Sequence, residues 1–313
     1  MPTYALLISP RAESAYFAQT LTVARAELSN AMPSNEIGEL AVGSMNFLTL
    51  ECGPDAISKL LRLSFVQGIF EKSVKVLSPI DALPEFNLHP DFVWGEKYRG
   101  KTNETLTQLL INLSLQAIPD ATTLCDPMCG RGTTLLWAMR YGLKSTGIEQ
   151  DPQALEDIQR GLKKWSKLHR QKHKLTQGWL QKTNKTGTGK YIDFSAEGTS
   201  LRLITGNTVD ALSILQNKRF DILATDIPYG IQHMGGKSTR SPLETLADAA
   251  QGWVSALRPD GVLAIAFNNY MPKRADLLQL YSTLGMEEIP TNVSHRMSES
   301  IVRDILLIRK TNA

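Results

Sequence analysis

Two polar strings about a hundred residues apart each follow an apolar run that predicts a buried β-strand. Residues 126–134 (DPMCGRGTT) follow TTLC, and residues 225–230 (TDIPYG) follow FDILA. In open α/β sheets, ligands bind beyond the carboxyl ends of the strands, where the loops begin. One loop is rich in glycine and the other carries Asp-x-Pro-Tyr, so the pair predicts an α/β sheet with a cofactor pocket beside a reaction site.

From residue 122 onward, predicted strands and helices alternate along the chain. TTLCD, KSTGIE, LRLIT, FDILATD and GVLAIAF each predict a strand, and helical patterns lie between them. The final two strands, near residues 288–293 and 302–309, leave no room for a crossover helix and should form an antiparallel hairpin. We therefore expect a doubly wound, mostly parallel seven-stranded sheet with an antiparallel edge strand.

The first 78 residues show a different pattern, with the element order β-α-β-β-α-β. EIGELAV and MNFLTLE alternate around Gly43-Ser44, which predicts a hairpin, and KSVKVLS at residues 72–78 predicts the last strand. This order is typical of a small α+β, ferredoxin-like domain. Residues 79–97 contain three prolines and predict a linker, which leaves residues 98–313 for the second domain.

Composition excludes several classes of protein. A chain of 313 residues suggests two domains of about 150 residues each. No apolar run reaches the roughly 20 residues that span a membrane, and the N-terminus does not resemble a signal peptide. Three cysteines cannot all pair, which favours a reduced, cytoplasmic protein without membrane association.

Positive charge is concentrated in one block. Residues 160–190 hold ten Lys and Arg and no Asp or Glu, although the whole chain carries only +3. Such a block attracts phosphates, but a solvated helix face would look the same. The candidate substrate-binding residues are Lys163, Lys164, Lys167, Arg170, Lys172 and Lys174, together with Lys237 and Arg240 in the later loop IQHMGGKSTR.

The glycine-rich loop has the chemistry of a cofactor site. Gly130 and Gly132 permit a positive φ and close backbone approach, and the following helix offers free N–H groups to a carboxylate. Asp126 at the strand end could meet an ammonium group directly or through water. A dinucleotide fingerprint would need another glycine where Leu135 stands, which argues against NAD or FAD.

Two further strand ends add candidate contacts. Glu149, in GIEQDP, can accept hydrogen bonds from both hydroxyls of a ribose. Asn207, in TGNT, is placed to contact an adenine edge, although a turn asparagine after Gly206 explains it nearly as well.

DPMCGRGTT, GIEQDP and DIPYG together resemble the RNA guanosine-N2 methyltransferases of the THUMP-associated tRNA guanosine methylase group, over about residues 98–309. The resemblance implies a class I Rossmann-like methyltransferase fold, S-adenosylmethionine as the cofactor, and methyl transfer to N2 of guanosine in tRNA or another structured RNA. The N-terminal segment is too short to hold a full-length THUMP domain as well as a ferredoxin-like domain. The implied cofactor-binding residues are Thr102, Asn103, Asp126, Pro127, Cys129, Gly130, Gly132, Thr133, Glu149, Gln150, Asn207 and Thr208.

The string DIPYG carries the predicted reaction chemistry. Asp226 and the backbone carbonyl of Ile227 would accept the hydrogens of an aromatic amine and turn its lone pair towards the methyl group. Pro228 restricts Ile227 to extended conformations, and Tyr229 would stack on the extruded base. The reaction needs no metal, and no His, Cys or Asp cluster in the sequence has the spacing of a metal site.

Three alternatives remain open at this point. A DNA adenine-N6 methyltransferase uses the same chemistry but should carry a larger target-recognition region. A protein glutamine-N5 methyltransferase favours Asn at position 226 and does not need the basic block. A non-catalytic RNA-binding relative is the third, because Ile227 departs from the Asp-Pro-Pro-Tyr pattern of the family.

Overall fold

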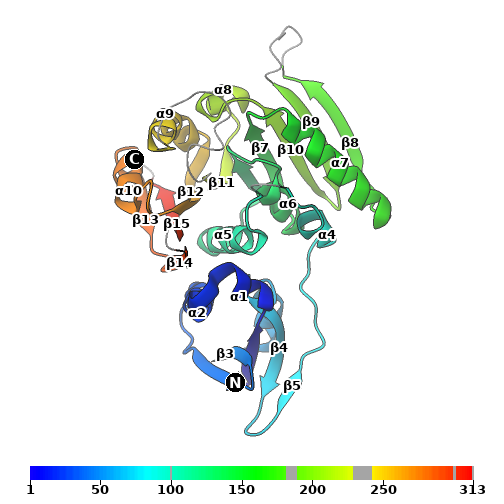
Figure 1. The fold of residues 1–313 in the computed structure, drawn as a ribbon, viewed down its shortest axis with the longest axis vertical. Helices are drawn as coiled ribbons and strands as arrows, with labels where there is room; N and C mark the ends of the chain where they lie inside the picture. Colours follow the sequence, from blue (N-terminus) through cyan, green and yellow to red (C-terminus); the bar gives the residue numbers. More distant parts are fainter. Residues whose placement is uncertain (99–100, 181–188, 228–241, 299–300, 312–313) are drawn as a thin grey trace. The chain divides into compact units, whose positions relative to one another are not determined.

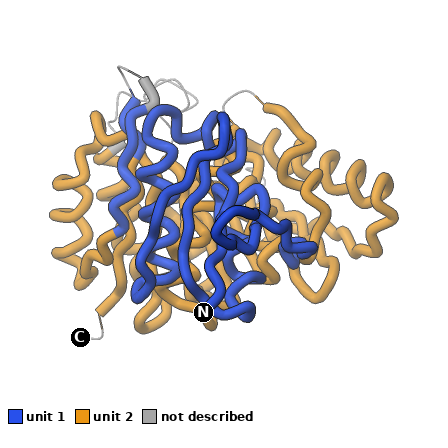
Figure 2. Tube along the Cα trace, turned by 90° about the horizontal axis from the view of Figure 1, so that it is seen from below, with its two compact units in different colours: residues 1–85, 291–303 blue, residues 86–290, 304–313 orange. Residues whose placement is uncertain are grey.

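The computed structural model describes residues 1–98, 101–180, 189–227, 242–298 and 301–311. The chain divides into two compact units, residues 1–85 with 291–303 and residues 86–290 with 304–313, which Figure 2 marks in two colours. The prediction assigned residues 291–303 to the second domain, whereas they belong to the first unit, where the ring of His295 packs edge-on against Tyr16. The division into a domain of residues 1–78, a linker of residues 79–97 and a domain of residues 98–313 stays a prediction.

The first unit contains one five-stranded antiparallel sheet in the order β2-β3-β1-β4-β5. Its elements are β1 Thr3–Ile8, α1 Pro10–Tyr16, η1 Phe17–Gln19, α2 Thr20–Ala31, β2 Gly38–Val42, β3 Met45–Glu51, η2 Pro54–Ala56, α3 Ile57–Leu60, β4 Val66–Lys72 and β5 Leu77–Pro79. The expected element order is present, but the strand predicted at 72–78 was wrong. Helix α3 ends after one turn, so that β4 begins at Val66 and the short strand β5 follows a turn.

The second unit is built on a larger sheet in the order β13-β15-β12-β11-β6-β7-β10-β9-β8 (Figure 1). The strands are β6 Thr123–Asp126, β7 Lys144–Glu149, β8 Lys174–Trp179, β9 Lys190–Ala196, β10 Thr199–Thr205, β11 Phe220–Asp226, β12 Leu257–Asn268, β13 Met286–Ile289 and β15 Ile301–Lys310, and β14 His295–Ser298 pairs with the start of β15. Strands β12, β11, β6, β7 and β10 are parallel, and β13 pairs antiparallel with β15. The predicted block of parallel strands with an antiparallel pair near the C-terminus is confirmed, but the sheet as a whole is mixed, because β9, β8, β13 and β14 are joined to it by antiparallel pairing.

The predicted count of seven strands was too low, because the described residues place ten strands in this sheet, nine in the order above and β14 paired with β15. Strands β8 and β9 form an antiparallel hairpin that extends the sheet beyond β10. Their sequences, KLTQGW and KYIDFSA, are polar at many positions, and β8 is largely exposed, so that no apolar run marks it. An exposed edge strand carries only weak sequence periodicity.

Helices cover both faces of the second unit's sheet. They are α4 Asp91–Trp94, α5 Glu104–Ala117, α6 Thr133–Arg140, α7 Gln153–Leu168, η3 Thr208–Asp210, α8 Ala211–Ile214, α9 Pro242–Ser255 and α10 Arg274–Ser282. Residues of α4, α6 and α7 share one buried apolar cluster, and residues of α8, α9 and α10 share another. No helix among the described residues is long and apolar enough to cross a membrane.

Candidate functional site

Three neighbouring parallel strands each end in an acidic residue. Asp126 ends β6, Glu149 ends β7 and Asp226 ends β11, and the strands lie in the order β11-β6-β7. Parallel strands share one carboxyl edge, so the three carboxylates lie along one edge of the sheet. The two strings singled out from the sequence are thereby brought side by side.

The glycine-rich loop joins β6 to α6 in a conformation that requires glycine. Gly130 has a φ of 51° and Gly132 a φ of 77°, both in the left-handed region. A Cβ at Gly132 would stand 2.5 Å from Cδ1 of Ile158, whereas a Cβ at Gly130 would meet nothing within 4 Å. The left-handed backbone of Gly132 therefore favours glycine, and the tip of Ile158 would have to move to admit a Cβ, whereas the backbone of Gly130 faces open space that a ligand can approach.

Glu149 connects this loop to the loop after β7. Its Oε2 accepts a hydrogen bond from the backbone N–H of Gly130 at 2.9 Å, and its Oε1 accepts one from Asp151 at 2.9 Å. Each carboxylate oxygen has a second lone pair and can accept a further hydrogen bond. The side chain thus shapes the glycine-rich loop and keeps the acceptor capacity that a ribose contact needs.

Asp126 is buried, with 2% of its surface exposed, and its Oδ1 accepts a hydrogen bond from the backbone N–H of Met128 at 3.0 Å. Burial raises the pKa of this carboxyl to about 7, and the Asp226 charge adds to the rise; Met128 and the nearby hydroxyls of Thr134 and Thr225 act against it. A cationic group bound beside Asp126 would keep it ionised. This fits the ammonium of S-adenosylmethionine.

The structure describes the segment TDIPYG, residues 225–230, only as far as Ile227. Asp226 is half-buried at the end of β11, in register with Ala266 of β12. Ile227 is 3% exposed within the apolar core, and its N–H donates to the carbonyl of Ala266 at 2.9 Å. Its side chain therefore packs in the core, where Ile can replace the Pro of the family pattern. Pro228, Tyr229, Lys237 and Arg240 lie outside the described residues.

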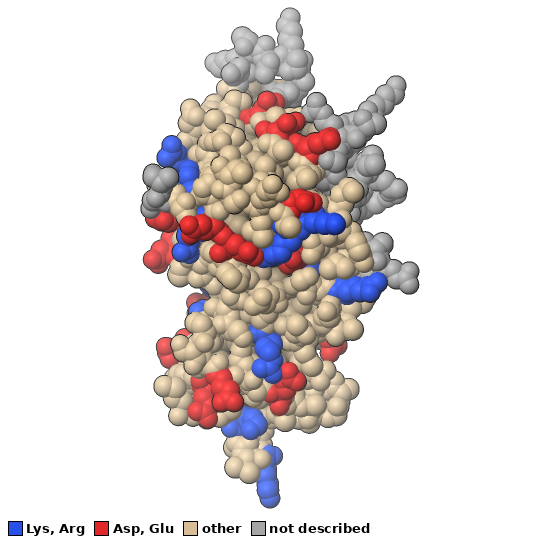
Figure 3. All heavy atoms as spheres, turned by 90° about the vertical axis from the view of Figure 1, so that its left-hand side faces the viewer, with Lys and Arg blue, Asp and Glu red and all other residues tan. Residues whose placement is uncertain are grey.

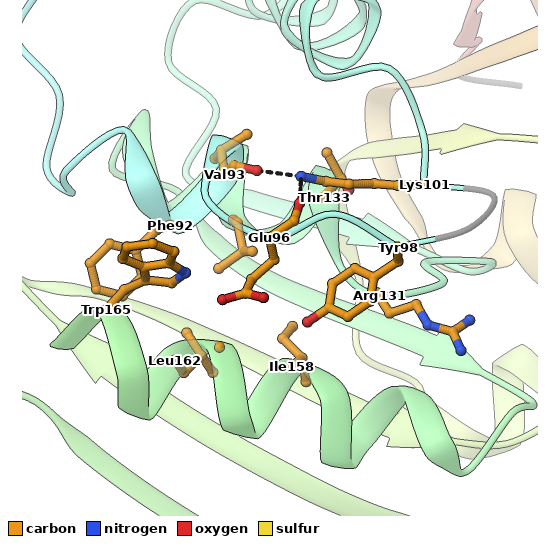
Figure 4. Close-up of a pocket in the computed structure, with 12 residues that line it drawn as sticks. Phe92, Val93, Glu96, Tyr98, Lys101, Arg131, Thr133, Ile158, Leu162 and Trp165 are labelled. Atoms are coloured by element: carbon orange, nitrogen blue, oxygen red, sulfur yellow. Dashed lines mark hydrogen bonds between the residues drawn. The ribbon is translucent and has the colours of Figure 1, made fainter. Parts of the chain in front are cut away.

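Thr102 and Asn103 lie directly before α5. Asn103 caps this helix, because its Oδ1 accepts from the N–H of Leu106 at 3.0 Å. Sequence reasoning missed the neighbouring Lys101, whose Nζ donates to the carbonyls of Val93 at 2.5 Å and Glu96 at 2.8 Å (Figure 4). It also pairs with Glu104 at 2.6 Å. Lys101 thus ties the start of α5 to the end of α4, a role that no local pattern indicates.

The remaining cofactor candidates have varied surroundings. Asn207 is exposed and its Oδ1 accepts from the N–H of Val209 at 3.1 Å, as expected of a turn asparagine. Thr208 is 8% exposed and its hydroxyl accepts from the indole N–H of Trp253 at 3.0 Å, so it supports the core. Cys129 is buried, and burial raises the pKa of its thiol. Pro127 and Thr133 flank the glycine-rich loop, and Gln150 is exposed beside Glu149.

A small hollow of about 20 Å³ lies on the α7 side of the glycine-rich loop (Figure 4). Arg131 and Thr133 line it from the loop, and Tyr98 and Glu96 line it from the segment after α4. None of the three acidic strand ends is among its lining residues. The hollow is therefore separate from the edge at which Asp226 lies.

The six described basic candidates, Lys163, Lys164, Lys167, Arg170, Lys172 and Lys174, are all exposed. Lys163, Lys164 and Lys167 lie in the second half of α7, and Arg170 and Lys172 lie in the segment that follows it. Lys174 begins β8, which runs in the same direction as β10. At 1.5 Å per residue, Lys163 and Lys167 lie about 15–21 Å along the helix from its first residue. Lys164 is partly neutralised by Glu96, 2.7 Å away. These residues therefore lie towards the amino ends of the parallel strands, whereas Asp226 lies at their carboxyl ends.

Elsewhere on the surface, charges of the two signs are mixed. On the face shown in Figure 3, Lys and Arg side chains alternate with Asp and Glu among the described residues. Arg274, for example, pairs with Glu288 at 2.6 Å and with Asp304 at 2.9 Å.

Sequence spacing indicated no group of metal-ligating residues, yet His89, Asp91 and His169 lie together, with one potential ligand atom of each within 4.8 Å of the others. His169 is 78 positions from Asp91 in the sequence, so spacing could not reveal the group.

Residues 96–292 match the family described as UPF0020, RMKL-like methyltransferase domain. No curated protein matches the sequence. Among solved structures, the chain is similar to TrmN from Thermus thermophilus (12% identity, TM-score 0.45, covering 90% of this chain and 64% of that one). It is also similar to the rRNA methyltransferase aviRa from Streptomyces viridochromogenes (17%, 0.44, 70% and 90%) and to a methyltransferase from Pyrococcus furiosus (14%, 0.44, 71% and 93%). The family match confirms the Rossmann-like α/β methyltransferase fold and S-adenosylmethionine as the cofactor.

Proposed function

The chain belongs to the RMKL-like methyltransferase domain family, and from this membership we propose that it methylates an exocyclic amine of a base in RNA. The proposed acceptor is N2 of guanosine in tRNA or another structured RNA. One observation carries the proposal: Asp226 ends the strand next to the one that carries Asp126 and the glycine-rich loop. A hydrogen-bond acceptor for an amine therefore stands beside the loop suited to the cofactor.

The chain's own residues position and polarise the amine. An exocyclic aromatic amine is a weak nucleophile, because its lone pair is delocalised into the ring. The Asp226 carboxylate accepts one amine hydrogen, and the carbonyl of Ile227 accepts the other, which directs the lone pair out of the ring plane. S-adenosylmethionine supplies the methyl group when it is bound. Alignment and fixed acceptors provide most of the rate enhancement in such a site.

The residues around the glycine-rich loop fit the cofactor chemically. Asp126 matches an ammonium group, and the backbone of Gly130 and the start of α6 match a carboxylate. Glu149 matches a pair of ribose hydroxyls, since both its oxygens keep acceptor capacity. This assignment of roles is part of the proposal, as are the contacts of Thr102, Asn103 and Asn207.

RNA is favoured as the substrate by the distance between Asp226 and the basic residues. Asp226 lies at the carboxyl ends of the parallel strands, and the basic residues Lys163, Lys167 and Lys174 lie towards their amino ends. A single nucleotide would therefore not reach from Asp226 to these lysines. An extended polyanion can place a base at Asp226 and its phosphates at these lysines. We also propose that the first unit is a ferredoxin-like domain, which its strand order β2-β3-β1-β4 supports.

The proposal is tested by mass spectrometry of nucleosides from the RNA of cells with and without the gene. We expect N2-methylguanosine to fall in the deleted strain at one position, and purified protein with S-adenosylmethionine to restore it. Methylated adenine in DNA or methylated glutamine in a protein, with RNA unchanged, would establish one of the alternative acceptors. Failure of the protein to bind S-adenosylmethionine would instead indicate a non-catalytic relative.

A further inference from the structure

We propose that His89, Asp91 and His169 form a binding site for a divalent transition-metal ion of the zinc type. Nε2 of His169 lies 2.9 Å from Oδ2 of Asp91, and Nδ1 of His89 lies 3.5 Å from the same oxygen. Ligand atoms bound tetrahedrally to Zn²⁺ at about 2.0–2.1 Å stand roughly 3.3 Å apart. The two separations from Asp91 bracket this value, and all three ligand atoms lie within 4.8 Å of one another. Because the two rings are stacked, the histidine side chains would have to rotate to direct both nitrogens at one ion.

The donor set selects the class of ion. Two imidazole nitrogens and one carboxylate oxygen suit Zn²⁺, Co²⁺, Ni²⁺ or Cu²⁺. Mg²⁺ and Ca²⁺ prefer sites made of oxygen ligands and would bind poorly here. Three protein ligands leave a fourth position for water. The side chains of His89, Asp91 and His169 are 44%, 37% and 22% exposed, so that an ion can reach them from solvent.

Ring contacts hold the two histidines near each other. The rings of His89 and His169 are stacked with centroids 3.6 Å apart and planes 22° apart. Nδ1 of His89 accepts a hydrogen bond from the N–H of Asp91 at 3.2 Å, and an ion bound to this nitrogen would replace that contact. Trp165 also stacks with His169, with ring centroids 6.1 Å apart.

The site lies away from the reaction edge and has a structural role. His169 is the C-terminal cap of α7, about 24 Å along the helix from the end next to Glu149. His89 and Asp91 lie at the start of α4, in the segment that the sequence analysis assigned to a linker. A bound ion would therefore fasten this segment to the end of α7. An ion that binds only the folded state raises the free energy of unfolding.

The test uses the full chain stripped of metal, titrated with Zn²⁺ by calorimetry and with Co²⁺ by visible absorption. We expect one ion per chain, a higher Tm with Zn²⁺, and a Co²⁺ spectrum typical of mixed nitrogen and oxygen ligands. His89→Ala and His169→Ala should each weaken binding by about tenfold or more. The matched control is His173→Ala, since His173 is exposed and stacks on Phe194 outside the cluster.

The outcomes separate this site from the proposed reaction. Zn²⁺ binding that persists in His89→Ala and His169→Ala would overturn the proposal, as would the absence of binding to the wild-type chain. His89 is the more exposed ligand, and its variant keeps the measurement valid if loss of His169 impairs folding. Circular dichroism and S-adenosylmethionine binding check that each variant is folded. Neither readout depends on the identity of the methylated substrate.

Discussion

The Oε2 atom of Glu149 accepts a hydrogen bond from the backbone N–H of Gly130, 2.9 Å away, between the loops that follow two neighbouring strands. Oε1 of the same carboxylate accepts from the N–H of Asp151 at 2.9 Å. One side chain thus holds both loops in place before any cofactor contact is made. Its structural and binding contributions can be separated by substitution.

Glu149→Gln should weaken S-adenosylmethionine binding and lower stability. The variant keeps one carbonyl oxygen but replaces the other acceptor with an NH₂ group, so one of the two backbone N–H groups loses its partner. The expected loss is about 1–3 kcal/mol of unfolding free energy, with at least a tenfold rise in Kd. Calorimetry and thermal denaturation provide both values. Glu156→Gln, at an exposed position of α7, is the control and should change neither.

Cofactor affinity should fall below neutral pH, because Asp126 has a pKa of about 7 in the free protein. If the carboxylate must be ionised to hold an ammonium, Kd should rise about tenfold per pH unit below that pKa and level off above it. Isothermal titration between about pH 5 and pH 7 measures the slope. Asp126→Asn should bind weakly with no such slope; a wild-type Kd that stays constant over this range would argue against the assigned role.

Asp126→Asn should also stabilise the folded chain at high pH. The native pKa of about 7 lies above the usual 3.8, so the native state binds the proton more tightly than the unfolded state does. The stability contribution from Asp126 is therefore present below about pH 4 and lost as pH rises through 7, by on the order of 4 kcal/mol. The variant's Tm should exceed that of the wild type at pH 8, and this advantage should disappear near pH 4.

Asp226→Ala should reduce methyl transfer by about 10²–10⁴-fold while cofactor binding stays within a few-fold of wild type. The reason is that Asp226 is proposed to contact the amine, whereas Glu149 and the glycine-rich loop hold the cofactor. Single-turnover assays and calorimetry measure the two properties separately. Asp210→Ala, at an exposed turn, should leave both unchanged. Full turnover in Asp226→Ala would remove this residue from the reaction.

The double variant Lys163→Gln, Lys167→Gln should weaken RNA binding and flatten its dependence on salt by roughly one unit of slope per lost phosphate contact. Lys164→Gln should have a smaller effect, because Glu96 already lies 2.7 Å from its ammonium group. Binding measured from low to moderate salt compares the three lysines, with Lys218→Gln as the surface control. Equal slopes in all of these proteins would mean that the basic residues are simply a solvated face.

Sequence patterns predicted those parts of the site whose conformation depends on residues close to them in the sequence. The strand before Asp126, the glycines after it and the strand before Asp226 are each recognisable within about ten residues. Strands β9 and β8, which extend the sheet beyond β10, were not predicted; β8 is the edge strand and is largely exposed, so that no buried apolar run marks it. Thr208 was assigned to the cofactor because of its neighbour Asn207, although its hydroxyl accepts a hydrogen bond from the distant Trp253.

The sequence by itself therefore determined the fold class, the cofactor and the loops that face it, because these follow from local periodicity and from turn residues with special backbone conformations. The tertiary structure was needed to show which charged side chains lie in contact and which are buried. The pKa of Asp126 depends on its complete burial beside Asp226, and the group of His89, Asp91 and His169 depends on α4 packing near the end of α7. Such effects arise between residues far apart in the chain, where burial and distance cannot be read from spacing.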